Sequence, residues 1–155
     1  MTKAGDPDLD TLDRAILRIL SEDAQTNFKT IAERARTTVG TVHNRIKRLK
    51  DAGIIRRMVP ELDAKRLGYG ITAMIDFQLA GGHLEEFQRQ LAQDPHVCSI
   101  YDITGEYDTT VVGKFRDTDD LNAFVKRQLE NKWVKRTSTK LVLNVVKESF
   151  APRLD

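Results

Sequence analysis

The sequence contains a single cysteine, Cys98, among its 155 residues. One thiol excludes an internal disulfide and a cysteine-based zinc cluster, so we expect Cys98 to be a small core residue in a reducing cytosol. The chain also lacks any apolar run approaching the roughly 18 residues that a membrane helix needs. Its acidic and polar start does not resemble a secretory signal. These absences predict a cytoplasmic, globular protein with no membrane partner.

Patterns typical of catalysis and metal binding are also missing. The sequence has no HxxxH motif, no paired-carboxylate signal and no Ser/His/Asp arrangement. His83 begins a predicted helix and His96 follows a proline, so neither histidine falls clearly in a cleft. We therefore expect no catalytic residue, no metal and no cofactor.

Positive charge is concentrated in one short part of the chain. The formal net charge is only +2, but residues 1–60 hold 12 basic and 8 acidic residues, whereas residues 61–155 hold 13 and 15. Between residues 34 and 57 the only acidic residue is Asp51, against eight basic residues: Arg34, Arg36, Arg45, Lys47, Arg48, Lys50, Arg56 and Arg57. Such an excess is typical of a nucleic-acid-binding surface. The alternative is a basic helix face that is simply solvated.

Residues 1–57 show the pattern of three short helices. Apolar residues recur at helical spacing over residues 9–20. Asn27 is placed to cap a second helix and Thr38 a third, and Gly53 stands where a glycine commonly ends a helix. Three helices in this space, the last two joined by a tight turn, predict a helix-turn-helix.

The remaining chain predicts a sheet covered by helices. Residues 58–68 are predicted as a connecting strand and linker, since the pattern from Ile54 to Leu62 is extended and Pro60 excludes a continuing helix. Residues 69–150 then predict strand 71–79, helix 83–93, strands 97–104 and 109–116, a helix from Asp117 or Thr118 to about 131, and strand 134–147. This βαββαβ order is ferredoxin-like. The fold class is therefore α+β, a winged-helix-like helix-turn-helix before a ferredoxin-like domain, with residues 151–155 as a tail.

The third predicted helix separates apolar from polar residues. At 100° per residue, one face carries Val39, Val42, Ile46 and Leu49. The opposite face, flanked by His43 and Arg45, carries Gly40, Thr41, Asn44, Lys47, Arg48 and Asp51. Asparagine can bond adenine, arginine can bond guanine, and threonine can meet a base edge or the thymine methyl group. Without a side chain, Gly40 would let the helix approach DNA closely. The pattern predicts a helix that reads the major groove.

Other groups are better suited to phosphate than to bases. The amides at the helix start, near Thr38, favour an anion. The predicted phosphate contacts are Arg36, Arg45, Lys47, Lys50, Arg56 and Arg57. For Arg45, an ion pair with Asp10 or Asp13 in the first helix is an open alternative, and for His43 a plain surface position is favoured.

Four separated motifs give the chain a family resemblance: LDTLDRAIL, TIAERARTTVGTVHNRIKRLKDAGII, SIYDITGEYD and VKRTSTKLVL. Together they resemble the Lrp/AsnC (feast/famine) family of transcriptional regulators over residues 8–150, and the ending VVKES is similar to archaeal members. The resemblance implies a regulator that binds double-stranded promoter DNA and senses a small effector, an amino acid or a related molecule, through a RAM-type domain. It also implies a homodimer that assembles further, commonly into an octamer.

The resemblance also implies where an effector binds. In the family the effector lies near the loop between the second and third strands, which is here Gly105, Glu106, Tyr107 and Asp108. The facing stretch on the last strand is Thr137, Ser138 and Thr139. From the residues alone, an ordinary hairpin turn and ordinary strand composition remain the alternative.

The chain departs from the family pattern at the turn before the third helix. Arg36-Thr37 stands where a glycine followed by an apolar residue is usual, and Val39-Gly40 replaces a common proline-containing start. DNA specificity therefore cannot be transferred from the family. Two alternative functions remain: a ligand-independent architectural DNA-binding protein, and an enzyme like the sirohaem decarboxylases, which resemble the same family.

Overall fold

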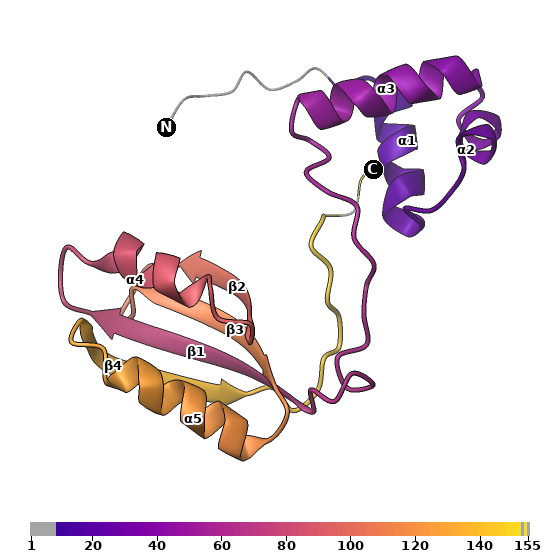
Figure 1. Ribbon diagram of the computed structural model, residues 1–155. Helices are drawn as coiled ribbons and strands as arrows, with labels where there is room; N and C mark the ends of the chain where they lie inside the picture. Colours follow the sequence, from indigo (N-terminus) through magenta and orange to yellow (C-terminus); the bar gives the residue numbers. More distant parts are fainter. Residues whose placement is uncertain (1–8, 153, 155) are drawn as a thin grey trace. The chain divides into compact units, whose positions relative to one another are not determined.

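The computed structural model describes residues 9–152 and 154, which form two compact units (Figure 1). The first unit comprises the described residues of Met1–Glu61 and Lys147–Asp155, and the second is Leu62–Val146. One boundary, between Glu61 and Leu62, lies inside the segment predicted to connect two domains, whereas the other, between Val146 and Lys147, lies inside the predicted domain of residues 69–150. Within the described part of the chain, no helix is both long and apolar enough to cross a membrane.

The first unit contains the three predicted helices, α1 (Thr11–Glu22), α2 (Phe28–Arg34) and α3 (Val39–Asp51). Each helix begins after a residue whose side chain accepts a hydrogen bond from a backbone N–H of the first turn: Asp10, Asn27 and Thr38. The predicted end of α3 is confirmed by Gly53, whose φ of 71° is a conformation that glycine adopts readily.

A small apolar core joins these three helices, formed by Ile16, Ile19, Ile31, Ala32, Val42 and Ile46. The prediction that Val39 belongs to the buried face is wrong, because its side chain at the first turn of α3 is 48% exposed. In the α2–α3 turn, Arg36 adopts a φ of 52°, the left-handed conformation that favours glycine. Arg36 therefore adopts in this turn a conformation that a glycine would favour.

The second unit is a four-stranded antiparallel sheet with two helices, as predicted. Its elements are β1 (Ile71–Leu79), α4 (Leu84–Leu91), β2 (Val97–Asp102), β3 (Thr109–Phe115), α5 (Thr118–Leu129) and β4 (Val134–Leu141). The strand order β2-β3-β1-β4 places the first and third strands in the centre. This is the ferredoxin-like arrangement, and with the helix-turn-helix it makes the fold α+β.

Both helices cover one face of this sheet (Figure 1). Phe77 of β1, Phe87 of α4, Phe115 of β3 and Phe124 of α5 are fully buried between the layers. Alternation along the strands sends the intervening side chains to the other face. That face is open in the single chain and exposes apolar side chains, including Met74 of β1.

Two predictions about extended segments were wrong, one about where a strand ends and one about whether a strand forms. β4 ends at Leu141 rather than at residue 147, and Leu143 is 93% exposed. Leu141 pairs with Ala73, close to the start of β1 at Ile71, so few residues of β1 remain with which a longer β4 could pair. The segment Ile54–Leu62 belongs to no strand in the described chain.

Cys98 is exposed, so the prediction of a core position is wrong. It lies on β2, an edge strand, where the register against β3 shifts between Val97 and Ser99. Such an irregularity redirects a side chain away from the regular alternation. Composition alone could not show it.

Candidate DNA-reading helix and effector loop

The solvent face of α3 presents the side chains that suit base contacts. Gly40, Asn44 and Lys47 are exposed, while Val42, Ile46 and Leu49 hold the opposite face in the core. A Cβ atom added at Gly40 would meet nothing within 4 Å in this chain. The absence of a side chain there is therefore not required by the fold itself. It leaves bare backbone at the start of the helix.

Thr38 and Thr41 form one capping unit at the start of α3. Thr38 Oγ1 accepts a hydrogen bond from the backbone N–H of Thr41 at 3.2 Å, and the two hydroxyls lie 2.9 Å apart. Thr41 is thus held next to the cap and half-buried. Its hydroxyl remains on the first turn, where a base edge or phosphate could meet it.

Arg45 and Arg48 face α1. The guanidinium of Arg45 lies 3.2 Å from both carboxylate oxygens of Asp13 and also pairs with Asp10. Arg48 pairs with the same Asp13. The open alternative for Arg45 is therefore the arrangement in this structure, and Arg48 shares it. For Asp10, the hydrogen bond from the Asp13 backbone N–H and then the one from Arg45 lower the pKa of the carboxyl.

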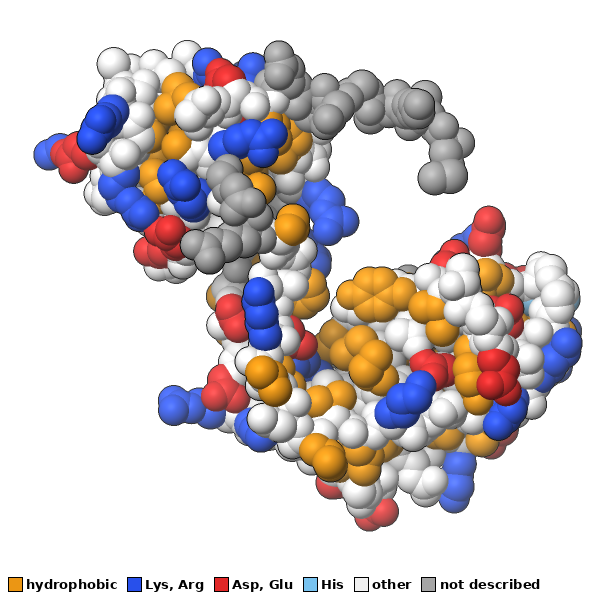
Figure 2. All heavy atoms as spheres, turned by 180° about the vertical axis from the view of Figure 1, so that it is seen from behind, with side chains coloured by type: hydrophobic (Ala, Val, Ile, Leu, Met, Phe, Trp, Pro, Cys, Tyr) orange, Lys and Arg blue, Asp and Glu red, His pale blue; other side chains and the backbone are white. Residues whose placement is uncertain are grey.

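The remaining predicted groups lie around this helix. The His43 ring meets the ring of Phe28 edge-on, with centroids 6.0 Å apart, so it is a surface residue with an aromatic neighbour. Five basic side chains pair with no carboxylate of the described residues: Arg36, Lys47, Lys50, Arg56 and Arg57. Figure 2 shows Lys and Arg side chains distributed over the surface of this helical unit.

The loop between β2 and β3 is tied to the end of β1. Asp108 Oδ2 accepts the backbone N–H of Leu79 at 2.7 Å, and the Asp108 N–H donates to the carbonyl of Phe77 at 3.0 Å. Gly105 has a φ of 117°, which glycine tolerates and other residues rarely adopt. The carboxylate of Asp108 thus already has a structural partner.

Arg136 at the start of β4 leans over this loop. Its guanidinium lies 2.6 Å from Glu106 and 5.8 Å from the centroid of the Tyr107 ring. Gln78 of β1 donates to the Glu106 carbonyl at 3.1 Å. Sequence reasoning missed Arg136 and Gln78, because their proximity depends on the pairing of Gln78 with Arg136 across two strands.

The three hydroxyl residues predicted on β4 do not share one surface. In the register, Thr137 opposes Phe77 and Thr139 opposes Ile75, so both lie on the helix-covered side. Ser138 lies on the open side. Of the three, only Ser138 therefore lies on the same face of the sheet as Arg136.

The open face also holds an ionic cluster that the sequence did not reveal. Asp76 is 5% exposed and accepts hydrogen bonds from Thr110 and Lys140 on the two flanking strands. Burial disfavours the charged carboxylate, but these hydrogen bonds and the charge of Lys140 outweigh it and keep the pKa of Asp76 below its usual value. The cluster fixes three strands relative to one another.

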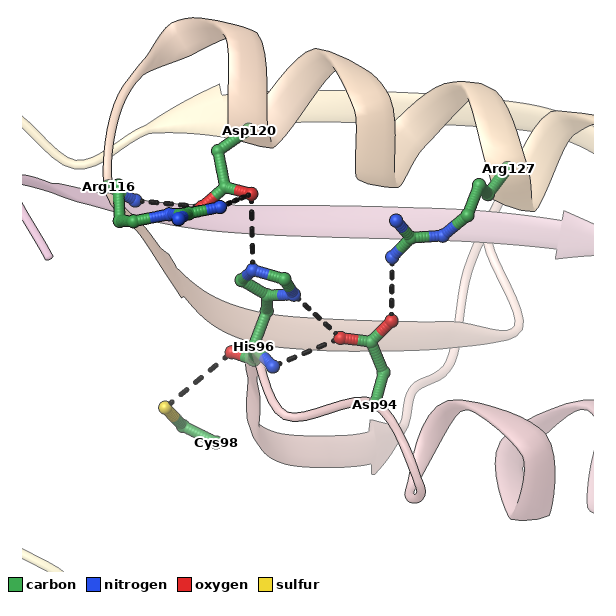
Figure 3. Close-up of polar contacts among 6 residues, drawn as sticks. All are labelled: Asp94, His96, Cys98, Arg116, Asp120 and Arg127. Atoms are coloured by element: carbon green, nitrogen blue, oxygen red, sulfur yellow. Dashed lines mark hydrogen bonds and ion pairs between the residues drawn. The ribbon is translucent and has the colours of Figure 1, made fainter.

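A second ionic network surrounds His96 (Figure 3). The His96 ring lies 2.8 Å from Asp94 and 3.2 Å from Asp120, and it stacks on Phe115. Hydrogen bonds from the side chain and backbone of Arg116 lower the pKa of Asp120 to about 2. The network joins the α4–β2 turn to α5. In the described chain, no group of three or more His, Cys, Asp or Glu side chains is arranged to hold a metal ion.

An apolar hollow of about 280 Å³ lies at the other end of the β2–β3 hairpin from the loop at Asp108. Its lining residues are Leu62, Ala64, Leu67, Tyr69, Pro95, Cys98 and Lys114. This hollow and the loop implied by the family resemblance are therefore different places.

Two family models match the chain. The winged helix-turn-helix DNA-binding model matches residues 9–56, and the Lrp/AsnC ligand binding domain model matches residues 72–152. An uncharacterized HTH-type transcriptional regulator of Pyrococcus furiosus is 43% identical over 143 residues, which cover 92% of this chain and 97% of the relative. An uncharacterized HTH-type transcriptional regulator of Haemophilus influenzae is 33% identical over 143 residues, which cover 90% of this chain and 85% of the relative.

Solved structures agree with these matches. A transcriptional regulator from Neisseria meningitidis, solved in complex with L-Met, has a TM-score of 0.87 at 27% identity, covering 92% of this chain and 94% of that one. AsnC of E. coli has a TM-score of 0.84 at 26% identity, covering 92% and 97%. With a DNA-binding helix-turn-helix and the ligand-binding domain in the matching order, the chain belongs to the Lrp/AsnC family of transcriptional regulators.

Proposed function

We propose that this regulator reads operator DNA with the solvent face of α3 and responds to an amino acid or a related small molecule. The observation that carries the DNA-reading half is the exposed row of Gly40, Asn44 and Lys47 above a buried apolar face. Asparagine supplies a bidentate pair for adenine, and the bare glycine backbone allows close approach to the groove.

Phosphate contacts surround this face. The amides at the start of α3, next to Thr38 and Thr41, suit one phosphate. Arg36, Lys50 and Arg56, which pair with no carboxylate in the described part of the chain, suit others, and each contact adds affinity without sequence preference. Lys50→Ala should therefore weaken binding to all duplexes about equally, whereas Asn44→Ala should reduce the preference for the operator.

The test of DNA reading is competition binding to a fragment from upstream of the chain's own gene. We expect the fragment to be preferred over bulk duplex DNA, and its affinity to fall steeply as salt rises. Equal binding to fragment and bulk DNA would contradict sequence-specific regulation. It would leave the architectural role.

The effector proposal places an amino acid at the loop beneath Arg136. The guanidinium offers a bidentate partner for an α-carboxylate, and Glu106 offers one for an ammonium group. Their ion pair in the free chain, at 2.6 Å, would exchange for these two bonds. The L-Met complex of the Neisseria meningitidis regulator supports a ligand of this class.

Thermal unfolding with each of the twenty amino acids tests the effector proposal. A ligand that binds only the folded chain raises stability by RT ln(1 + [L]/Kd). Arg136→Gln should remove the response, whereas Arg127→Gln, which changes the same charge at the pair with Asp94, should keep it. A response that survives Arg136→Gln would move the site elsewhere, with the hollow near Cys98 as the next candidate.

We also propose that the open face of the sheet pairs two copies of the chain, which assemble further, as the family resemblance implies, into octamers. The exposed Met74, Tyr101 and Ile103 give this face an apolar surface. Sedimentation should detect a dimer or a multiple of it. A Met74→Glu variant that remains folded should shift the mass toward the monomer.

The enzyme alternative has no feature in its favour. The relatives that match most of the chain carry the name of transcriptional regulators. The His96 ring contacts Asp94 and Asp120 and stacks on Phe115. A regulator without catalytic residues remains the proposal.

A further inference from the structure

Asp13 is a fully buried carboxylate surrounded by cationic donors. It stands in the first turn of α1 and has no exposed surface. Its Oδ1 accepts from Arg45, and its Oδ2 accepts from Arg45, Arg48 and the backbone N–H of Asp10. Both arginines come from α3, the helix that the matched DNA-binding domain would lay on DNA.

The arginines are held unequally. The side chain of Arg45 is 28% exposed and is shared between Asp10 and Asp13. The side chain of Arg48 is 53% exposed, and Asp13 is its sole ion-pair partner among the described residues. Arg48 therefore lies at the rim of α3, within reach of solvent, but its guanidinium is turned toward α1.

We propose that Asp13 is a positioning residue for DNA recognition: it occupies the guanidinium groups of Arg45 and Arg48 as a DNA phosphate would. A carboxylate and a phosphate both accept bidentate bonds from arginine, so the two compete for the same donors. While Asp13 holds them, these two cations add little to non-specific attraction. The contrast between operator and bulk DNA then depends more on the exposed face that begins at Gly40.

The plain alternative is that Asp13 only fastens α1 to α3. Both roles predict that loss of the carboxylate lowers stability, so stability cannot separate them. The salt dependence of DNA binding can, because each additional phosphate contact steepens the slope of log K against log salt by about 0.9. Between 50 and 200 mM salt this corresponds to about a 3.5-fold greater loss of affinity per contact.

The experiment compares Asp13→Asn with Glu22→Gln in the full chain, using a non-specific duplex and the operator fragment. Glu22 lies on the same helix and pairs with Arg34 of α2, so its substitution matches the change in charge without touching either arginine of α3. We expect Asp13→Asn to steepen the non-specific slope by about 0.9 to 1.8 and to lower the preference for the operator. Glu22→Gln should steepen it by less. Equal slopes in the two variants would overturn the proposal.

A double variant identifies the released group. If Arg48 is the cation that reaches DNA in Asp13→Asn, adding Arg48→Ala should return most of the extra slope. Asp13→Glu, which restores the charge, should also return the slope toward the wild-type value. An extra slope that persists in both variants would overturn the proposal, since it would arise from neither the arginine nor the lost charge.

If Asp13→Asn does not fold, the wild-type chain provides the test. Nitrogen-detected spectra of the arginine side chains should show Arg45 and Arg48 unshifted on addition of non-specific duplex, whereas Arg56 should shift. Shifts of all three would overturn the proposal. The inference rests on the proposed DNA binding through α3, but the two fail differently. A wild-type chain that prefers no DNA contradicts the proposed function. A wild-type chain that prefers its operator, with an Asp13→Asn variant whose salt dependence is unchanged, contradicts this inference alone.

Discussion

The helical unit and the sheet unit use their polar side chains in different ways. On α3 the side chains that we propose to contact DNA, such as Asn44 and Lys47, form no ion pair or hydrogen bond with another side chain in the described part of the chain. In the loop of the sheet unit, the carboxylate of Asp108 holds the end of β1 and Glu106 is paired with Arg136. DNA affinity and folding stability are therefore separable at the exposed face of α3, whereas effector affinity and folding stability are coupled in the loop of the sheet unit.

The largest test of this contrast is Asp108→Ala. It leaves the buried backbone N–H of Leu79 without its acceptor, which should lower the free energy of unfolding by about 1–3 kcal/mol. Denaturant unfolding of the variant beside Asp108→Asn, which keeps an oxygen acceptor, measures it. A stable Asp108→Ala chain that has lost only its effector response would place Asp108 in the ligand site and break the contrast.

Asn44→Ala is the matching test in the helical unit. It should cost on the order of 1–3 kcal/mol of operator affinity and relax sequence preference, with stability within about 0.5 kcal/mol of wild type. Operator titrations and denaturant unfolding of the same preparation give both values. Loss of both together would show that Asn44 supports the fold.

Gly40→Ala should raise the stability of the folded chain and lower its affinity for DNA. Alanine favours a helix interior over glycine by about 0.8–1 kcal/mol, less near an end, and the added Cβ meets nothing in this chain. If DNA comes close to the bare backbone, affinity should fall even as thermal stability rises. Unchanged affinity would place the start of α3 away from the groove.

The smallest expected effect is a loss of stability of the sheet unit at acidic pH. Arg116 holds the pKa of Asp120 at about 2, below the ordinary 3.8, so the ion pair stabilises the folded chain above pH 3.8 and its contribution disappears as the pH falls through 2. The contribution is modest, because water screens an exposed arginine. Unfolding midpoints at pH 5 and pH 2.5 should differ less in Asp120→Asn than in wild type, whereas an identical acid loss would assign it to other carboxylates.

The parts that were predictable from sequence rest on local chemistry. Asn27 and Thr38 cap helices by bonding backbone groups three residues away, and Gly53 ends α3 through its own backbone angle. The ferredoxin-like order likewise followed from changes in apolar period. These signals need no knowledge of which distant residues meet.

The rest depended on partners far apart in the sequence. Arg48 appeared suited to guanine until the structure placed it beside Asp13, 35 residues away. Arg136 carried no signal, since only the pairing of β1 with β4 brings it over the loop. The early end of β4 depends on where β1 begins. Periodicity assigns a residue to a face, but the structure decides whether that side chain is still free.

The turn at Arg36 has a consequence for how this protein can evolve. An arginine with a φ of 52° costs about 1 kcal/mol relative to a relaxed backbone, and glycine would relieve it. Every arginine codon is a single nucleotide change from a glycine codon. That one mutation would exchange a cation beside the helix that we propose to read DNA for a relaxed turn, so under this proposal turn stability and DNA affinity are set against each other at one codon.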